Sequence, residues 1–237
     1  MTETLTEAAV RAMLPPRPAD SHKGTFGRAV IAGGHYGMAG APLLAARAAL
    51  RTGVGLAEVA VPQRVYPLLA AAVPEAIFTP LPEDDTGGLT AASADALLPR
   101  LSAADALVLG CGMGQGSGVT ALCRAVLPAA PCPVVLDADG INALDRHILS
   151  TMERKAPLVL TPHRRELGRL MGLPDTPPDS LTSALEAARR IVWSDGGSEL
   201  AIVAKGTATA CVGVEAALLP KPGPASLATA GSGDVLS

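Results

Sequence analysis

Short apolar runs alternate with longer stretches rich in Ala and Leu along most of the chain. The runs have the length and the Val and Ile content of buried strands, whereas the longer stretches repeat apolar residues at helical spacing. The pattern predicts strands at residues 28–32, 56–61, 77–79, 106–109, 134–137, 158–161, 200–204 and 207–214. It predicts helices at residues 41–52, 64–72, 92–101, 119–127, 141–144, 165–171 and 181–193.

Strands that alternate with helices form right-handed crossovers, so we expect an α/β fold with a mainly parallel sheet covered by helices on both faces. The last two strands are joined through Lys205 and Gly206, which predicts an antiparallel hairpin at one edge of the sheet. Two segments rich in Pro and Gly, residues 80–88 and 174–179, are expected to be surface loops. Residues 1–237 are expected to form one domain.

Composition adds information about the core. Hydrophobic residues make up 49% of the 237 residues, but aromatic residues only 2%. The core must therefore be built from Ala, Val, Leu and Ile, which suit close packing of helices on a sheet. Four cysteines (Cys111, Cys123, Cys132 and Cys211) lack CxxC spacing and stand in apolar or Gly-rich surroundings. We expect buried free thiols there, rather than metal ligands or disulfides.

Charge is balanced along the chain. The 19 Lys and Arg residues against 22 Asp and Glu residues give a net charge of −3, without a long run of either sign. We therefore expect small-molecule partners, and neither nucleic acid nor an anionic membrane. The N-terminus lacks the basic and apolar regions of a signal peptide, and no apolar run is long enough to span a bilayer. A cytoplasmic location is expected.

The strongest motif for chemistry is the small-residue and glycine turn at residues 228–237, Ala-Thr-Ala-Gly-Ser-Gly-Asp-Val-Leu-Ser. Its glycines allow backbone N–H groups to converge on an anion, and a following helix N-terminus adds partial positive charge. Asp234 would lie in the first helical turn, where the dipole favours its anionic form and where it could take the proton of an attacking hydroxyl. The alternative is an ordinary glycine-rich loop in which Asp234 caps the helix.

A second glycine cluster, Gly-Cys-Gly-Met-Gly at residues 110–114, directly follows a predicted strand. It fits close approach of the backbone to a ligand, but it lacks the remainder of the dinucleotide-binding fingerprint. Asp137 and Asp139 follow the next strand, where they could hold Mg²⁺ through water or bind ligand hydroxyls. For Asp139 we favour helix capping instead, and we expect Asn142 to face a ligand.

Two further strand ends carry polar residues, and ligands of open α/β sheets bind beyond the carboxyl ends of the strands. His163 closes one strand and could donate a hydrogen bond to a phosphate or to a polar group of a substrate; the alternative is a surface histidine that caps a loop. Residues 205–209, Lys-Gly-Thr-Ala-Thr, follow another strand and suit the phosphates or ribose of a nucleotide. The alternative for Lys205 is a solvated lysine in a turn.

Taken together, these segments resemble the NAD(P)H-hydrate dehydratase family of the ribokinase-like superfamily. The matching segments are residues 22–27, 31–34, 40–42, 48–53, 74–75, 110–114, 133–139, 160–163, 205–206 and 228–236. Their number, order and spacing carry the resemblance. It implies a ribokinase-like three-layer α/β/α sandwich.

The resemblance also implies a metabolite-repair reaction. ADP, or ATP in some lineages, would donate its terminal phosphoryl group to the ring hydroxyl of the (S)-epimer of hydrated NADH or NADPH (NADHX or NADPHX). Phosphate would then leave, restoring NAD(P)H and releasing AMP when ADP is used, with Mg²⁺ bridging phosphate oxygens. The family resemblance further implies a homotetramer.

The resemblance assigns roles residue by residue. Asp234 would be the catalytic base and would contact the hydrate. The hydrate would also contact Ala41, Gly112, Gly114 and His163. The nucleotide would contact Lys205, Gly206, Thr207, Ala208, Thr209 and Gly233. The anion hole would comprise Gly231, Ser232 and Gly233. No residue is assigned as a dedicated metal ligand.

The chain departs from the family pattern in three places and in length. Residues 224–227 replace the usual Asn-Pro-Gly-Met, residues 163–166 read His-Arg-Arg-Glu instead of His-Pro-Gly-Glu, and Ala208 stands where Gly is common. The chain ends at Ser237, where the family continues through further helices, so we expect a domain truncated at its C-terminus. An epimerase domain, often fused in this family, is not expected.

Two other functions remain open from the sequence. One is a small-alcohol or vitamin-precursor kinase of the same superfamily, in which the phosphate stays on the product. The other is a nucleotide-binding protein without catalysis.

Overall fold

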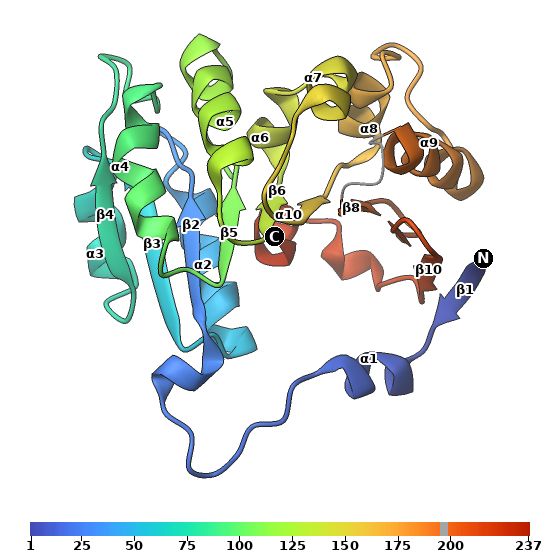
Figure 1. The fold of residues 1–237 in the computed structure, drawn as a ribbon, viewed down its shortest axis with the longest axis horizontal. Coiled ribbons are helices and arrows are strands. Elements are labelled where there is room, and N and C mark those ends of the chain that lie inside the picture. Colours follow the sequence, from blue (N-terminus) through green and yellow to red (C-terminus); the bar gives the residue numbers. More distant parts are fainter. Residues whose placement is uncertain (195–198) are drawn as a thin grey trace.

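The computed structural model describes residues 1–194 and 199–237, and its strands form one ten-stranded sheet. The strands are β1 (Thr2–Leu5), β2 (Arg28–Ala32), β3 (Leu56–Pro62), β4 (Ile77–Leu81), β5 (Ala106–Leu109), β6 (Val134–Leu136), β7 (Leu158–Leu160), β8 (Leu200–Ala204), β9 (Ala210–Val212) and β10 (Ala217–Pro220). Their order across the sheet is β1-β10-β9-β8-β7-β6-β5-β2-β3-β4 (Figure 1). Strands β2 to β8 are parallel to one another, whereas β9 is antiparallel to both β8 and β10.

Helices cover both faces of this sheet. The helices are α1 (Glu7–Met13), α2 (Gly40–Thr52), α3 (Tyr66–Ala72), α4 (Ala92–Leu101), α5 (Ser117–Ala129), α6 (Ala138–Asn142), α7 (Arg146–Thr151), α8 (Arg164–Leu170), α9 (Leu181–Ser194) and α10 (Ser232–Leu236), with 3₁₀ turns at Lys23–Phe26 and Ala225–Leu227. Helix α1 has no buried residue and covers neither face. Helices α2 and α3 pack on one face, where α10 lies against α2, and helices α4 to α9 form the layer on the other face (Figure 1). The predicted three-layer α/β/α arrangement is confirmed.

The central strands are buried on both faces because their alternate residues serve two cores. Val30 and Ala32 of β2 belong to the larger core, with side chains of α4, α5 and α9, whereas Ile31 points to the opposite face and packs with Ala45 and Ala46 of α2. Side chains of successive strand residues point to opposite faces, and continuous apolar runs therefore mark such strands. This is why the apolar runs located β2, β3 and β5 correctly.

The structure extends the sheet beyond the predicted hairpin. Strands β8 and β9 form the expected antiparallel pair, but β10 adds beyond β9, and β1 pairs in parallel with β10. The residues of β1 are exposed except for the half-buried Leu5, so the sequence has no apolar pattern that predicts this strand. At the opposite edge, β4 runs to Leu81, so the expected loop at residues 80–88 begins inside a strand; Pro80 is tolerated because β4 is an edge strand.

All four cysteines are free thiols, as expected. Cys111, Cys123 and Cys132 are buried, and Cys211 is half-buried. Burial raises the pKa of the Cys123 thiol to about 12, which keeps this side chain protonated and unreactive at neutral pH. Among the helices of residues 1–194 and 199–237, none is long and apolar enough to cross a membrane.

A buried carboxylate fastens β2, β3 and α4 together. Glu58 of β3 is fully buried and accepts hydrogen bonds from Arg28, from Arg100 Nε at 2.6 Å and from Thr79 Oγ1 at 2.5 Å. Burial by itself would raise the pKa of Glu58, but the hydrogen bonds from Arg100, Thr79 and Arg28 outweigh it and lower the pKa. The carboxylate therefore stays charged inside the fold.

We predict that Glu58→Ala lowers the free energy of unfolding by about 2–3 kcal/mol at neutral pH, because Arg28 and Arg100 would lose the partner that compensates their desolvation. Urea unfolding followed by circular dichroism measures the change. Since the pKa of Glu58 is lowered in the folded state, its contribution is lost as the pH falls through that pKa, and the gap between the two proteins should narrow in acid. Glu7→Ala on the exposed helix α1 is the control, and an equal effect of both substitutions would contradict the prediction.

Candidate active site

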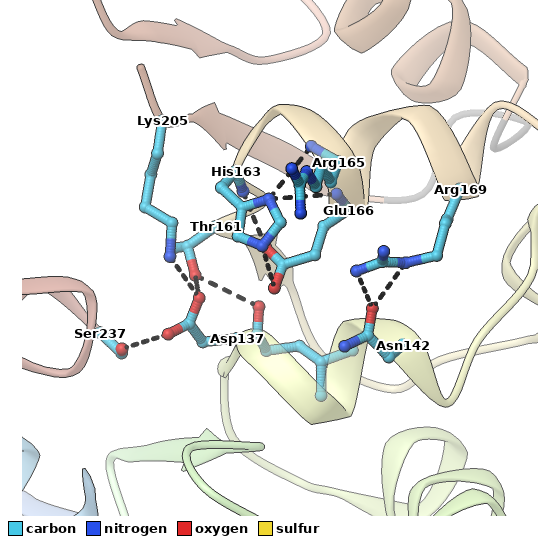
Figure 2. A network of polar contacts seen from close by, with 10 residues as sticks. Asp137, Asn142, Thr161, His163, Arg165, Glu166, Arg169, Lys205 and Ser237 are labelled. Atoms are coloured by element: carbon cyan, nitrogen blue, oxygen red, sulfur yellow. Dashed lines mark hydrogen bonds and ion pairs between the residues drawn. The ribbon is translucent and has the colours of Figure 1, made fainter. Parts of the chain in front are cut away.

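Polar residues that follow three neighbouring parallel strands meet at one edge of the sheet. Asp137 follows β6, Thr161 follows β7 and Lys205 follows β8. Asp137 is buried at the centre: its Oδ1 accepts hydrogen bonds from Thr161 Oγ1 at 2.6 Å and from Lys205 Nζ at 2.7 Å (Figure 2). Its Oδ2 accepts a hydrogen bond from Ser237 Oγ at 2.9 Å. One carboxylate thus joins two strand ends to the C-terminal helix α10.

The backbone around Asp137 is tightly constrained. The next residue, Ala138, has a φ of 47°, a left-handed conformation that is costly for any residue with a Cβ. A Cβ at Gly110 would lie 2.0 Å from the Asp137 carbonyl oxygen, so only glycine permits this approach of the two loops. Strain of this kind persists where the surrounding structure over-determines it, and it clusters at functional sites.

Asp139 and Asn142 both make contacts that differ from the expected ones. We expected Asp139 to cap the helix, but the N-cap position of α6 belongs to Asp137. Asp139 Oδ2 instead accepts a hydrogen bond from Gly114 N at 2.8 Å. The capping expectation was wrong because the preceding loop approaches α6 and supplies a donor from outside the helix. Asn142 Oδ1 accepts hydrogen bonds from Arg169 Nε at 3.0 Å and Nη2 at 2.7 Å, and its ligand-facing role stays a prediction.

His163 and Glu166 form a capping box at the start of α8. His163 Nδ1 accepts hydrogen bonds from Arg165 N at 3.1 Å and Glu166 N at 3.3 Å, and Glu166 Oε2 accepts one from His163 N at 2.7 Å (Figure 2). Burial and the positive charge of Lys205 lower the pKa of His163. Burial raises the pKa of Glu166 to about 7. His163 therefore acts as a cap, in agreement with that part of the alternative interpretation, although it caps a helix and not a loop. Its neutral imidazole lies beside Lys205.

Helix α10 places Asp234 next to this network. Gly231 has a left-handed φ of 85°, and a Cβ there would lie 2.5 Å from Leu44 Cδ1 of α2, so glycine allows α10 to dock closely. A Cβ at Gly233 would lie 3.4 Å from Lys205 Nζ. Burial and the negative charge of Asp137 raise the pKa of Asp234, and Lys205 only partly offsets this rise. The expectation that the helix start favours the anion was wrong, because a helix of five residues contributes little against these two effects.

Of the residues assigned to the hydrate, Ala41, Gly112 and Gly114 lie on the other side of Asp137, over β5 and β2, whereas His163 follows β7 and lies on the side of Lys205. Gly112 has a φ of 64°, and a Cβ there would lie 2.9 Å from the Ala41 Cβ, so these two residues are neighbours. Gly34 N donates to the Cys111 carbonyl oxygen at 2.9 Å and ties the two loops together. Gly114 belongs to the same loop as Gly112.

The residues assigned to the nucleotide lie in the connection between β8 and β9. Lys205 is mostly buried, Gly206 and Thr207 are exposed or nearly so, and Ala208 and Thr209 are half-buried. Along this edge the structure thus places the nucleotide residues at β8, His163 at β7, Asp137 with the nearby Asp234 at β6, and Gly112 with Ala41 toward β5 and β2. Their individual roles remain predictions.

Three contributors to the site were missing from the set that the resemblance assigned: Asp137, Glu166 and Ser237. The position of Asp137 after an apolar strand run had suggested a ligand role, but it did not reveal the bonds to Lys205 and Ser237. A separate cavity of about 600 Å³ lies over β7, β8 and β9, and none of the residues assigned to ligands lines it.

Comparison with known proteins identifies the family. A family model described as NAD(P)H-hydrate dehydratase matches residues 29–237. The chain belongs to the NAD(P)H-hydrate dehydratase family. Within it, the bifunctional NAD(P)H-hydrate repair enzyme of Moorella thermoacetica is 38% identical over 236 residues, an alignment that covers 98% of this chain and 43% of that protein. The ADP-dependent (S)-NAD(P)H-hydrate dehydratase of Bacillus subtilis is 34% identical over 98% of this chain and 77% of its own length.

Solved structures of this family confirm the fold. The ADP/ATP-dependent NAD(P)H-hydrate dehydratase of Bacillus subtilis, co-crystallised with ATP and Mg²⁺, superposes with a TM-score of 0.77 at 32% identity, covering 99% of this chain and 78% of that one. A ribokinase-like superfamily protein of Enterococcus faecalis gives a TM-score of 0.77 at 23% identity, covering 99% and 77%. The predicted ribokinase-like fold is therefore confirmed. The chain spans about two fifths of the length of the bifunctional family members that it matches.

We predict opposite effects of two substitutions on the pKa of Asp234. Lys205→Met should raise it further, because the lysine charge is the one that stabilises the carboxylate, and Asp137→Asn should lower it by removing a nearby negative charge. Carbon NMR of the Asp234 carboxyl group during a pH titration measures both shifts. Lys221→Met, in the exposed segment after β10, should leave the pKa unchanged; a shift in the same direction for all three variants would refute the electrostatic origin.

Proposed function

We propose that this protein is a dehydratase that uses ADP, or alternatively ATP, to restore NADH or NADPH from its hydrated (S)-epimer, with release of AMP and phosphate when ADP is used. The observation that carries the proposal is the position of Asp234: its half-buried carboxylate has a raised pKa and stands beside Lys205 and the glycine turn. The similarity to the ADP-dependent (S)-NAD(P)H-hydrate dehydratases of Bacillus subtilis and Neisseria meningitidis supports the choice of substrate.

Asp234 would act as the general base. A carboxylate with a raised pKa accepts a proton more readily, and efficiency is greatest when the pKa approaches the working pH. Burial and the charge of Asp137 raise the pKa of Asp234, whereas the charge of Lys205 lowers it and so favours the ionised carboxylate. The hydroxyl of the hydrated ring would lose its proton to Asp234 as it attacks the terminal phosphorus of the nucleotide.

The turn from Gly231 to Gly233 would stabilise the transferred phosphoryl group. The first N–H groups of a helix have no partner inside the helix, and in α10 they belong to Ser232, Gly233 and Asp234. The Ser232 N–H makes a long hydrogen bond of 3.4 Å to the Thr229 carbonyl oxygen, which a phosphoryl oxygen would replace. Such donors, fixed before the reaction, stabilise charge that develops in the transition state. Lys205 lies beside Gly233 and would neutralise phosphate charge on the nucleotide, and the hydroxyl groups of Thr207 and Thr209 would bind its polar parts.

The hydrate would lie against residues that leave room for its ring. Ala41 and Gly112 are small and adjacent. His163 Nδ1 is occupied by the helix cap and Nε2 lies 3.3 Å from Glu166 Oε1, so the imidazole would bind the hydrate by turning its Nε2–H from Glu166 to the ligand. Expulsion of phosphate from the phosphorylated ring, with loss of a proton from the neighbouring ring carbon, would then restore the double bond. Gly114 would contact the same part of the ligand.

The carboxylate oxygens of Asp137 and Glu166 fit Mg²⁺ only if a bound nucleotide supplies further oxygen ligands. Asp137 and Glu166 influence each other electrostatically and supply carboxylate oxygens, but no group of three acidic, His or Cys side chains within residues 1–194 and 199–237 could hold a metal by itself. Mg²⁺ commonly binds through one or two carboxylates plus phosphate oxygens, so Asp137 and Glu166 are the residues that would hold it. When bound, the ion neutralises charge on the phosphates.

The kinase and the non-catalytic alternatives have weaker support. Escherichia coli phosphofructokinase-2 superposes with a TM-score of 0.58 at 16% identity, a likeness of fold alone. The homotetramer, the cytoplasmic location and the absence of a nucleic-acid partner stay predictions.

We predict that the protein restores the near-ultraviolet absorbance of NADH from NADH hydrate when ADP and Mg²⁺ are supplied. Asp234→Asn should lower kcat by about a hundredfold to ten-thousandfold, the usual contribution of a general base. Asp95→Asn is a matched control, because Asp95 also lies in the first turn of a helix but is exposed on α4. Equal rates for the two variants would contradict the role of Asp234, a product that keeps its phosphate would indicate a kinase, and nucleotide binding without turnover would indicate a binding protein.

A further inference from the structure

A second, smaller cavity lies at the same edge of the sheet, between the loops that follow β2, β4 and β5. Its volume is about 150 Å³, and His35, Asp84 and Gln115 are among the residues that line it. Pockets for whole drug-sized ligands measure about 300–1,000 Å³, so this one has room for a single small ring. It adjoins the hydrate residues, because a Cβ at Gly114 would lie 3.5 Å from the His35 ring.

Two hydrogen-bond acceptors face this cavity across Gly88. Asp84 Oδ1 is occupied, since it accepts hydrogen bonds from Thr86 N at 2.9 Å, Thr86 Oγ1 at 2.6 Å and Gly88 N at 3.0 Å. The other oxygen, Oδ2, faces Gly88, where a Cβ would lie 3.3 Å from it and 3.4 Å from His35 Nε2. His35 Nδ1 lies 2.7 Å from the Tyr36 carbonyl oxygen and donates to it, so the tautomer with its proton on Nδ1 has Nε2 as an acceptor.

The loops that carry these acceptors are held in place before any ligand binds. Tyr36 N donates to the Gly87 carbonyl oxygen at 3.1 Å, and Gly87 has a left-handed φ of 81°. Arg64 pairs with Glu83 at 2.9 Å and donates to the Asp85 carbonyl oxygen at 3.0 Å. Acceptors fixed in this way select a ligand with hydroxyl donors and disfavour a phosphate, which has only acceptor oxygens at neutral pH.

The order of residues along the sheet edge indicates which hydroxyl groups these are. The nucleotide residues follow β8, His163 follows β7, Asp234 stands beside Asp137 after β6, and the other hydrate residues, Ala41, Gly112 and Gly114, lie toward β5 and β2. A hydrate that contacts His163 and Gly112 spans the strand ends from β7 to β5, so the rest of the dinucleotide would extend away from the nucleotide, toward β2, β3 and β4. The cavity lies in that direction.

We propose that Asp84 Oδ2 and His35 Nε2 accept hydrogen bonds from the two hydroxyl groups of the ribose attached to the nicotinamide ring. The placement of the ring rests on the proposed function. These two hydrogen bonds make Asp84 and His35 residues that select a substrate carrying a ribose. Neither residue takes part in the chemical step. A carboxylate that accepts from ribose hydroxyls is a common device of nucleotide sites.

Equilibrium binding of NADH, followed by its fluorescence, tests the proposal without requiring turnover. Asp84→Asn keeps the oxygen that caps the loop and replaces the free acceptor by an amide donor. Gly88→Ala adds a methyl group between the two acceptors at a backbone position with no left-handed strain. Each should weaken NADH binding about tenfold, the loss expected for one hydrogen bond to a charged acceptor.

Three controls make the result specific. Gly213→Ala, where the nearest atom to a new Cβ is 3.9 Å away, should bind NADH like the wild type. ADP affinity measured by calorimetry should be the same in all four proteins, and N-benzyl-dihydronicotinamide, which lacks the ribose, should bind wild type and D84N equally.

The proposal is overturned if wild type does not bind NADH, if D84N and G88A bind it like wild type, or if the analogue without ribose loses affinity equally. A loss of ADP affinity in both variants would also overturn it, since that indicates damage to the whole site. If NADH binding depends on Asp84 but NADH hydrate is not turned over with ADP or ATP, the proposed function fails and the ribose subsite stands.

Discussion

The buried carboxylate of Asp137 is the interaction on which the candidate site depends. A charge with 1% exposure is stable only when partners replace its water, and here Lys205, Thr161 and Ser237 do so from three different segments. The same bonds fix the ends of β7 and β8 and the last turn of α10 relative to one another. Positioning of the site and stability of this edge therefore come from one group.

This charge also sets the electrostatics of its neighbours. It raises the pKa of Asp234 and of Glu166 and adds to the burial that raises the pKa of the Cys111 thiol. Lys205 acts in the opposite direction on Asp234 and lowers the pKa of His163. Together with burial, Asp137 thus favours a basic Asp234 carboxylate and a protonated Cys111 thiol, whereas burial and Lys205 favour a neutral His163 imidazole. A basic carboxylate is what the proton abstraction proposed for Asp234 needs.

Elements marked by apolar runs could be predicted from the sequence, whereas contacts between distant segments could not. Buried strands such as β2 and β5 are visible in the sequence as continuous apolar runs, because both of their faces need apolar side chains. The exposed strand β1 has no such run, because it joins the sheet through its backbone. The same limit applies to the site: the glycine turn before Asp234 is a local pattern, but the bond from Gly114 to Asp139 depends on the fold of two loops that are 25 residues apart.

The two sides of the site differ in hydrogen-bonding chemistry, and this difference can orient both ligands. On the β8 side the protein offers donors, the Lys205 ammonium and the backbone N–H groups of the glycine turn, which match the acceptor oxygens of phosphates. On the β2 side it offers acceptors, Asp84 Oδ2 and His35 Nε2, which match sugar hydroxyls. A nucleotide placed with its phosphates toward Asp84 would meet a carboxylate, whereas the same phosphates placed toward Lys205 would meet a cation. The proposed arrangement of the two ligands avoids this repulsion, and it would leave the ring hydroxyl of the hydrate between the two sides, beside Asp234.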